Sequence, residues 1–248
     1  MSFPNTIYGR AGWEKVETSD QRHKLGTRMA FADGRVYRYC KTGAAIGVGR
    51  LAQAPATDAA DDMDLAWSAG GGAGETTITT GTSLTITKDQ YKEGWLYKND
   101  EKDEGHIYPI KGNTAVSSAA GCVFTIDEED GFKVASSATT DLFGVVYNLY
   151  DGVIVQPTTI TNAAVGVTPV ALSSGYYGWL QTWGPAALLD TGATWVVGDQ
   201  LAAAEGTAAG AATLLDSSTA QDNQSIGYSM YIKPATTDFG FVNLTIAP

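Results

Sequence analysis

All six arginines of this 248-residue chain lie within its first 50 residues, and arginine is well suited to binding a charged surface. These 50 residues carry nine basic and four acidic side chains, a net charge of +5, whereas the rest of the chain carries −16. A guanidinium group binds a carboxylate through two parallel hydrogen bonds and tolerates loss of water better than an ammonium group. We therefore predict an interface with an acidic partner surface, formed by Arg10, Trp13, Arg22, Lys24, Arg28, Arg35 and Arg38.

The same arginines have a second candidate use, which is to pair with acidic side chains of the protein's own body. The sequence leaves this alternative open. Nucleic acid is not expected as a partner, because the overall net charge of −11 would repel phosphate groups.

Residues for catalysis and metal binding are few and unfavourably spaced. Hydrolysis by a serine or cysteine nucleophile usually needs a histidine base, but the chain has only His23 and His106 and no Gly-x-Ser-x-Gly sequence. These histidines and the two cysteines, Cys40 and Cys122, do not occur at the spacings of zinc ligands. We therefore predict no catalytic residue, no metal site and no cofactor, and we do not expect an enzyme.

The two cysteines stand far apart and outside any Cys-x-x-Cys pair. This spacing favours two reduced thiols, with a disulfide between Cys40 and Cys122 as the alternative.

Acidic residues gather in the stretches 99–105 and 127–131. A loop that opens at Asn99 places Glu104 and Ile110 where an EF-hand needs a glycine and a carboxylate, so that pattern fails. Solvated acidic turns are favoured, and a calcium site of another kind is the alternative.

The elements that position these residues are predicted to be strands. Glycine, threonine and aromatic residues are frequent, and charged residues make up only 17% of the chain, a composition typical of half-buried strands joined by tight turns. Residues 2–21, here called the N-terminal arm, show no period of 2 or 3.6 and are interrupted by Pro4, Gly9 and Gly12. We predict a mainly β fold of antiparallel sandwich or barrel modules with an extended N-terminal arm.

Glycine-containing turns predict several hairpins. Asp33-Gly34 separates strands at 29–31 and 36–39, and Asp151-Gly152 separates strands at 143–150 and 153–155. Acidic loops separate 94–97 from 106–110, and 122–126 from 132–134. Further strands are predicted at 76–79, 84–87, 176–183, 187–189, 195–197, 226–232 and 239–246, with Gly184-Pro185 marking a strand end.

Changes in composition suggest three successive regions. A loop-like stretch at 52–74 and a second break near 161–169 divide the chain. The regions are a basic arm with the first hairpin (1–50), a central β region with acidic loops (51–165), and a C-terminal barrel or sandwich (166–248). The N-terminus lacks the pattern of a secretory signal and no stretch reaches 18 apolar residues, so we expect cytoplasmic synthesis and no membrane contact.

The C-terminal region resembles capsid decoration (cement) proteins of tailed bacteriophages. The resemblance rests on Tyr177–Gly184, Val197–Leu201, Gly206–Gly210 and Ile226–Tyr228, and Asp33–Tyr39 looks like the opening of small virion proteins of such phages. It implies a symmetric oligomer, commonly a trimer, that sits outside an icosahedral head and bridges subunits of the major capsid protein. No catalytic residue carries over. The chain departs from the smallest decoration proteins in its length and in its segment 75–160.

We therefore predict a virion structural protein on the capsid exterior, made in the host cytoplasm, that stabilises the head. The alternative is a glycan-binding β module, such as a head fibre or receptor-binding protein, and a hydrolase with an unrecognised site is a third. Aromatic faces bind sugar rings, and the tryptophans that could supply them, unless the core buries them, are Trp67, Trp95, Trp179, Trp183 and Trp195.

Overall fold

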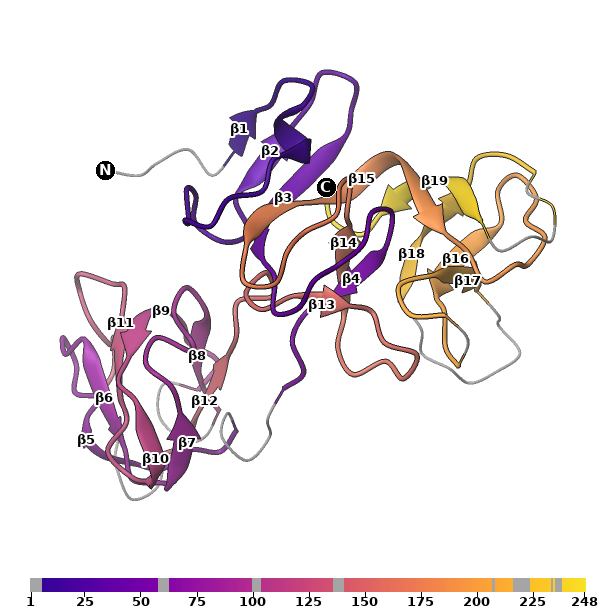
Figure 1. The fold of residues 1–248 in the computed structure, drawn as a ribbon. Coiled ribbons are helices and arrows are strands. Elements are labelled where there is room, and N and C mark those ends of the chain that lie inside the picture. Colours follow the sequence, from indigo (N-terminus) through magenta and orange to yellow (C-terminus); the bar gives the residue numbers. More distant parts are fainter. Residues whose placement is uncertain are drawn as a thin grey trace. The chain divides into compact units, whose positions relative to one another are not determined.

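Strands dominate the computed structural model of the chain, which confirms the predicted mainly β class with antiparallel sheets. The model describes residues 6–57, 63–99, 104–135, 141–206, 208–215, 224–232, 234 and 238–248. Two compact units form, one from Met1–Ala56 with Leu149–Pro248 and one from Thr57–Asn148. We call them the discontinuous unit and the inserted unit (Figure 1).

This division differs from the three successive regions expected from composition. Residues 1–50 and 166–248 belong to one unit because β3 (Val36–Lys41) pairs with β15 (Tyr177–Leu189) along most of its length. The two breaks in composition are not simply loops, because the stretch 52–74 contains β5 (Trp67–Gly70) and the stretch 161–169 contains β14 (Ala164–Val167). The units follow instead from pairing between distant strands.

The discontinuous unit is built on one sheet in the order β1-β2-β3-β15-β19-β18-β16-β17, with β14 joining β15 and β4 joining both β13 and β14. Its remaining elements are β1 (Thr6–Tyr8), the 3₁₀ helix η1 (Trp13–Lys15), β2 (Arg28–Ala30), β4 (Leu51–Gln53), β13 (Ile154–Val155), β14 (Ala164–Val167), β16 (Gln200–Ala203), β17 (Ala212–Leu214), β18 (Ser225–Ser229) and β19 (Phe239–Thr245).

β15 is the longest strand and changes partner midway. Its first half pairs with β3 as far as Trp183, and its second half pairs with β19 from Trp183 to Leu189. The predicted strand end at Gly184-Pro185 is therefore wrong. A proline lacks the N–H that a central strand donates, but it is tolerated where a strand needs a neighbour on one side only. Gly184 has a φ of 84°, which permits the bend at this change of partner.

The largest core cluster of the discontinuous unit lies beneath β19 and its neighbours. Trp195, Leu188, Leu201 and Leu244 are completely buried there. The strand predicted at 195–197 is wrong. The chain turns directly after Trp195, where Asp199 N donates a hydrogen bond of 3.2 Å to Val196 O.

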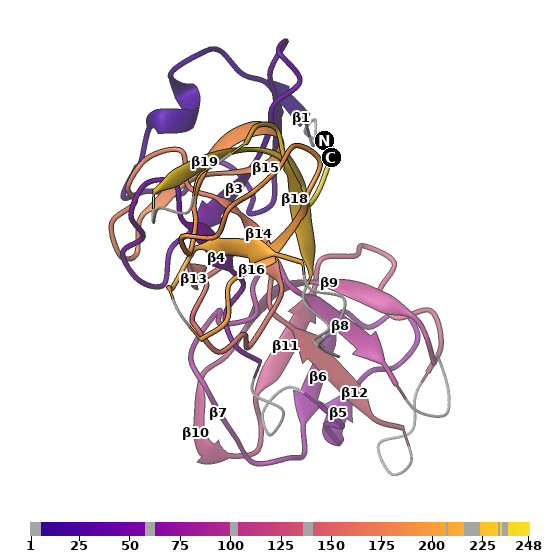
Figure 2. The same cartoon turned by 90° about the vertical axis from the view of Figure 1, so that its right-hand side faces the viewer.

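The inserted unit has its own core, which includes the buried aromatic residues Trp67, Tyr91, Phe124 and Phe143. A six-stranded sheet in the order β12-β8-β9-β11-β6-β5 and a pair, β10-β7, enclose it, and Figure 2 shows β7 and β10 side by side. The strands are β5 (Trp67–Gly70), β6 (Thr77–Thr80), β7 (Leu84–Ile86), β8 (Trp95–Lys98), β9 (Ile107–Asn113), β10 (Val116–Ala119), β11 (Val123–Ile126) and β12 (Phe143–Val146).

Two predicted hairpins are present and two are wrong. β2 pairs with β3 across Asp33-Gly34, and β8 pairs with β9. The strand expected at 132–134 is reduced to one bridge between Phe132 and Ala73, and β12 and β13 pair with β8 and β4 rather than with each other. Asp151-Gly152 therefore lies near the boundary between the units, where it joins strands that pair elsewhere.

The N-terminal arm has little regular structure, as expected, but its described part is attached to the discontinuous unit. β1 lies parallel to β2, and Gly9 N donates to Ala30 O at 2.9 Å. Thr18 and Tyr177 exchange backbone hydrogen bonds of 2.8 and 2.9 Å. The described part of the arm is therefore attached to the sheet at Thr6–Gly9 and again at Thr18.

Candidate functional site

A cleft of about 790 Å³ lies where the arm covers the sheet, and we call it the N-terminal cleft. Its floor consists of Tyr39 on β3 and Trp179 on β15, which are buried and whose ring centroids are 5.0 Å apart. Its rim carries Tyr8, which is 83% exposed, and Trp13, which is 48% exposed. Two of the seven predicted interface residues, Trp13 and Arg22, line this one cleft.

His23 stands beside the floor of the cleft, with its ring centroid 5.1 Å from that of Tyr39 and 5.5 Å from that of Trp179. Burial and the neighbouring charge of Arg22 lower the pKa of His23 below its usual value of 6.5. The imidazole is therefore neutral at neutral pH. Arg22 is left as the positive charge among the lining residues of the cleft.

Arg22 is exposed, and its backbone N–H donates to the hydroxyl of Tyr39 at 3.1 Å. Within the described residues, no acidic side chain pairs with the guanidinium of Arg22, Arg10 or Arg28. Among the residues that the structure describes, acids of the protein itself therefore do not occupy these three arginines. Arg22 combines a free charge with adjacent aromatic faces, an arrangement suited to a carboxylate next to an apolar group.

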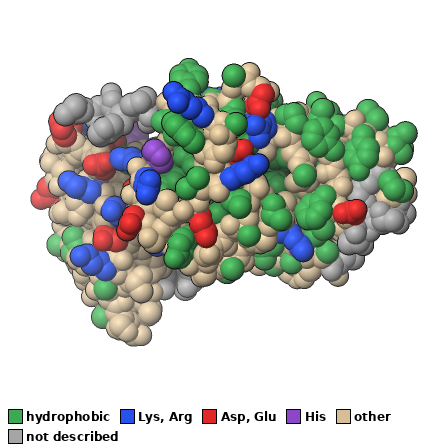
Figure 3. Space-filling view, turned by 45° about the horizontal axis from the view of Figure 1, so that its top comes forward, with side chains coloured by type: hydrophobic (Ala, Val, Ile, Leu, Met, Phe, Trp, Pro, Cys, Tyr) green, Lys and Arg blue, Asp and Glu red, His purple; other side chains and the backbone are tan. Residues whose placement is uncertain are grey.

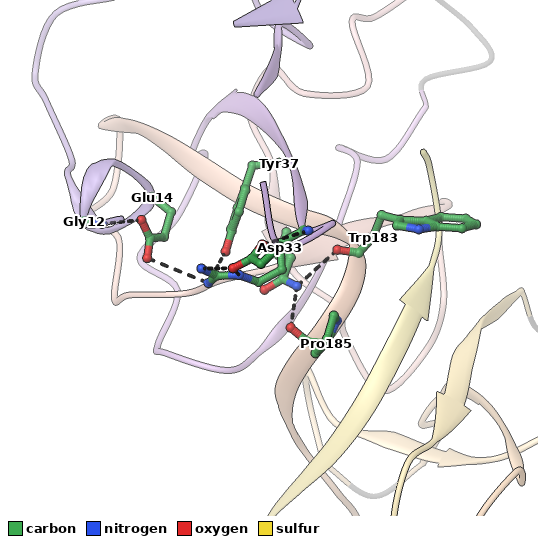
Figure 4. A network of polar contacts seen from close by, with 8 residues as sticks. Gly12, Glu14, Asp33, Tyr37, Trp183 and Pro185 are labelled. Atoms are coloured by element: carbon green, nitrogen blue, oxygen red, sulfur yellow. Dashed lines mark hydrogen bonds and ion pairs between the residues drawn. The ribbon is translucent and has the colours of Figure 1, made fainter. Parts of the chain in front are cut away.

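Arg35, in contrast, is used within the protein, and its partners Asp33, Tyr37 and Glu14 are labelled in Figure 4. Its Nε and Nη2 lie 2.8 Å from Oδ2 of Asp33, and its Nη1 donates to the hydroxyl of Tyr37 at 2.8 Å. Glu14, which is buried, lies 3.9 Å from Nη1 and accepts a hydrogen bond of 2.7 Å from Gly12 N. Arg35 therefore pairs with an acid of the protein itself, which is the alternative that the sequence left open for the arginines.

The other predicted interface residues do not join the cleft. Arg28 and Arg38 lie opposite each other on β2 and β3, on the face away from the buried Met29 and Tyr37. Arg38 donates to the carbonyl oxygens of Gly26 (3.2 Å) and Pro248 (2.9 Å). The exposed residues Arg10 and Lys24 are also absent from the lining of the cleft, so only two of the seven residues line it.

Tyr37 makes stability sensitive to strongly alkaline pH. Burial raises its pKa from 10.0 to about 12, so the folded protein holds this proton more tightly than the unfolded chain does. The stabilisation is complete below about pH 10 and is lost as the pH rises toward 12. We expect the free energy of unfolding to fall by about 2 to 3 kcal/mol more over this range in the wild type than in Tyr37→Phe. Urea denaturation at several pH values measures the difference, and parallel curves would contradict it.

Both cysteines are free and buried, so the disulfide alternative is wrong. Cys40 lies in a core cluster of the discontinuous unit, where burial raises its pKa to about 12, and Cys122 lies in the core of the inserted unit. A thiol held in its protonated form is a poor nucleophile. Neither cysteine therefore offers an activated sulfur for catalysis.

The acidic stretches give no calcium site among the described residues. Of the stretch 99–105, residues 100–103 lie outside the described part of the chain. In the turn 127–131, Asp130 pairs with Lys133 at 3.0 Å. Where the chain is described, no group of three or more histidine, cysteine, aspartate or glutamate residues is placed to hold a metal ion. Within the same ranges, no helix is long and apolar enough to cross a membrane.

The tryptophans proposed for glycan binding are mostly in the core. Trp67, Trp179 and Trp195 are buried, whereas Trp183 is partly buried and Trp95 is 46% exposed. Trp13, one of the predicted interface residues, is about as exposed as Trp95. The tryptophan faces open to a ligand are therefore chiefly those of Trp13 and Trp95.

Comparison with family models, with curated proteins and with solved structures finds no match to this chain. The resemblance to decoration proteins thus stays a prediction from the residues quoted for it. The floor of the N-terminal cleft could not be located from sequence, because Tyr39 and Trp179 are brought together by pairing across the sheet. The sequence shows only that Tyr39 and Trp179 each belong to an aromatic stretch predicted to be a strand.

Proposed function

We propose that the protein is a virion structural protein that binds the outer surface of an icosahedral phage head and stabilises it by bridging subunits of the major capsid protein. The observation that carries the proposal is the N-terminal cleft, which joins an aromatic rim to an arginine that no acidic side chain of the described chain neutralises. The proposal takes this cleft as the contact with the capsid.

The composition of the cleft is that of a protein-binding surface. Tryptophan, tyrosine and arginine are the residue types that contribute most to the free energy of protein association. Tyr8 and Trp13 have exposed apolar area to bury, and Arg22 has donors to satisfy. A partner segment with an aromatic or aliphatic residue next to a carboxylate would meet both requirements.

A binding role of this kind needs only modest affinity from each copy. When a shell presents many identical sites, a ligand that bridges two of them dissociates far more slowly than one held at a single site. A ligand that binds only the assembled shell also stabilises it by mass action. No catalytic group is needed for either effect.

The test is co-sedimentation of the purified protein with heads of the source phage that lack it. We expect saturable binding in simple proportion to the capsid subunit, and weaker binding at high salt because salt screens the attraction between Arg22 and a carboxylate. Heads from which acidic surface residues have been removed by substitution provide the control and should bind less.

Absence of binding at both low and high salt would overturn the proposal. The glycan-binding alternative would then be the better candidate, with the exposed face of Trp95 as its stacking surface.

A further inference from the structure

His23 is a titratable side chain that lines the N-terminal cleft with its ring open to a bound molecule. Its backbone carbonyl accepts a hydrogen bond of 3.0 Å from Gln21, but within the described residues neither nitrogen of the ring bonds to another protein group. The side chain is only partly buried, and neither ring nitrogen is among the buried polar atoms that lack a partner. Both nitrogens are therefore available for hydrogen bonds to a ligand in the cleft.

Tyr39 holds both His23 and Arg22 against the sheet. Its hydroxyl accepts the backbone N–H of Arg22 at 3.1 Å, and its ring meets the His23 ring edge to face, at an interplanar angle of 88°. The ring of Trp179 lies beside His23 as well, tilted by 47°. The imidazole is therefore held next to the arginine at the floor of the cleft.

The described lining of the cleft contains two basic side chains and no acidic one. Arg22 comes from the N-terminal arm, β1 and β3 contribute the hydroxyl groups of Tyr8 and Tyr39, and Trp179 of β15 carries no titratable group. Glu17, an acid of the arm, is used elsewhere, because it accepts hydrogen bonds of 2.7 and 3.0 Å from Ser173. Acidic side chains are scattered over the face drawn in Figure 3, so their absence from the lining is a local feature.

This arrangement makes the charge of the cleft depend on pH. Histidine is the side chain whose charge ordinarily changes between pH 5 and 8, so a protonated His23 adds a second positive charge beside Arg22. Partial burial and repulsion by Arg22 lower the pKa of His23, which means that the free protein resists this protonation. A carboxylate in the cleft removes the repulsion and can accept a hydrogen bond from both groups.

We propose that Arg22 and His23 together bind one carboxylate of the partner, so that the N-terminal cleft holds an acidic partner more tightly in mildly acidic than in neutral solution. The inference rests on the proposed function, because it names the group of the capsid that enters the cleft and the condition that favours it. Aspartate and glutamate side chains of ordinary pKa stay ionised over the range in which a histidine gains its proton. Binding of the carboxylate and protonation of His23 therefore strengthen each other.

Binding of labelled protein to heads at pH 7.5 and at pH 5.5 tests the proposal. We expect the wild type to bind about threefold more tightly at pH 5.5, the size of effect that one partly exposed ion pair gives. His23→Gln should bind equally at both pH values, because its side chain stays neutral. His106→Gln is the matched control: it removes the only other histidine of the chain, which is exposed on the inserted unit, and it should keep the gain.

A titration of the wild type without heads tests the site itself. The NMR signals of the two histidine rings, assigned with the two variants, are followed over pH with and without phenylacetate, a probe that joins an aromatic ring to a carboxylate. We expect phenylacetate to raise the pKa of His23 and to leave the titration of His106 unchanged. This measurement needs no substitution, so it holds even if His23→Gln disturbs the packing against Tyr39.

The outcomes separate this inference from the proposed function. Head binding of the wild type that is the same at both pH values, a His23→Gln variant that keeps the gain, or a His23 titration that does not respond to phenylacetate would overturn the inference and leave the capsid contact standing. If heads bind at neither pH while phenylacetate still shifts His23, the capsid is rejected as the partner and the carboxylate site stands.

Discussion

Replacement of Gly240 by alanine is expected to lower the free energy of unfolding by about 3 kcal/mol, although it adds only one methyl group. A Cβ atom at position 240 would lie 2.1 Å from Cζ3 and 2.8 Å from Cε3 of Trp195. Trp195 is completely buried in the core beneath β19, where close packing resists a shift of the ring. The sheet must therefore shift or the indole must leave its position, and chemical denaturation followed by tryptophan fluorescence measures the loss.

Gly47→Ala is the matched control, because the nearest atom to its added Cβ would be Cγ of Arg50 at 3.8 Å, an ordinary contact. We expect this variant to unfold within about 0.5 kcal/mol of the wild type. In a Trp195→Ala background the clash is gone, so Gly240→Ala should cost little there. Equal losses in Gly240→Ala and Gly47→Ala would show that the indole does not pack against β19 as described.

The double variant Trp13→Ala/Arg22→Gln is expected to weaken capsid binding on the order of one hundred fold, through loss of about 3 kcal/mol. Trp13 supplies the rim of the N-terminal cleft and Arg22 its charge. Because Arg22 is the salt-sensitive element, the binding that is left should also vary less with salt. Titration of heads with labelled protein at two salt concentrations gives both quantities.

The inserted unit offers a closely matched control, Trp95→Ala/Lys111→Gln. Trp95 is 46% exposed, against 48% for Trp13, and Lys111 is exposed. The two double variants therefore lose the same kind of aromatic surface and the same charge. We expect the control to bind heads like the wild type, and equal losses in the two variants would remove the cleft from the proposed interface.

Local signals in the sequence predicted local structure well. Asp33-Gly34 forms the turn between β2 and β3 because both strands lie within ten residues of it and Arg35 closes the turn on Asp33. Asp151-Gly152 carries the same signal, yet its flanking strands pair with β8 and β4. A two-residue turn indicates where the chain reverses, but the pairing is decided by which buried faces meet, and that information is spread over the whole chain.

For the candidate site, too, the sequence indicates residue types but not which side chains pair with each other. Residue type singled out Trp13 and Arg22, which line the N-terminal cleft, and their role in an interface stays a prediction. Residue type could not separate them from Arg35, which is held by Asp33 and Tyr37, because an acidic residue two positions away in the sequence does not by itself show that the two side chains pair.

The pairing of β3 with β15 sets an order on events during synthesis. Every strand of the inserted unit finds its partners within Thr57–Asn148, so that unit can close while the ribosome is still translating. The discontinuous unit cannot close at that stage. Ser173 N, which donates a hydrogen bond to Glu17, lies 156 positions after it, and β3 pairs with β15, which is synthesised after the inserted unit. Tyr39, which is buried in the folded unit, lacks Trp179 to pack against through that interval, so we expect the early part of the chain to be prone to aggregation until the unit closes.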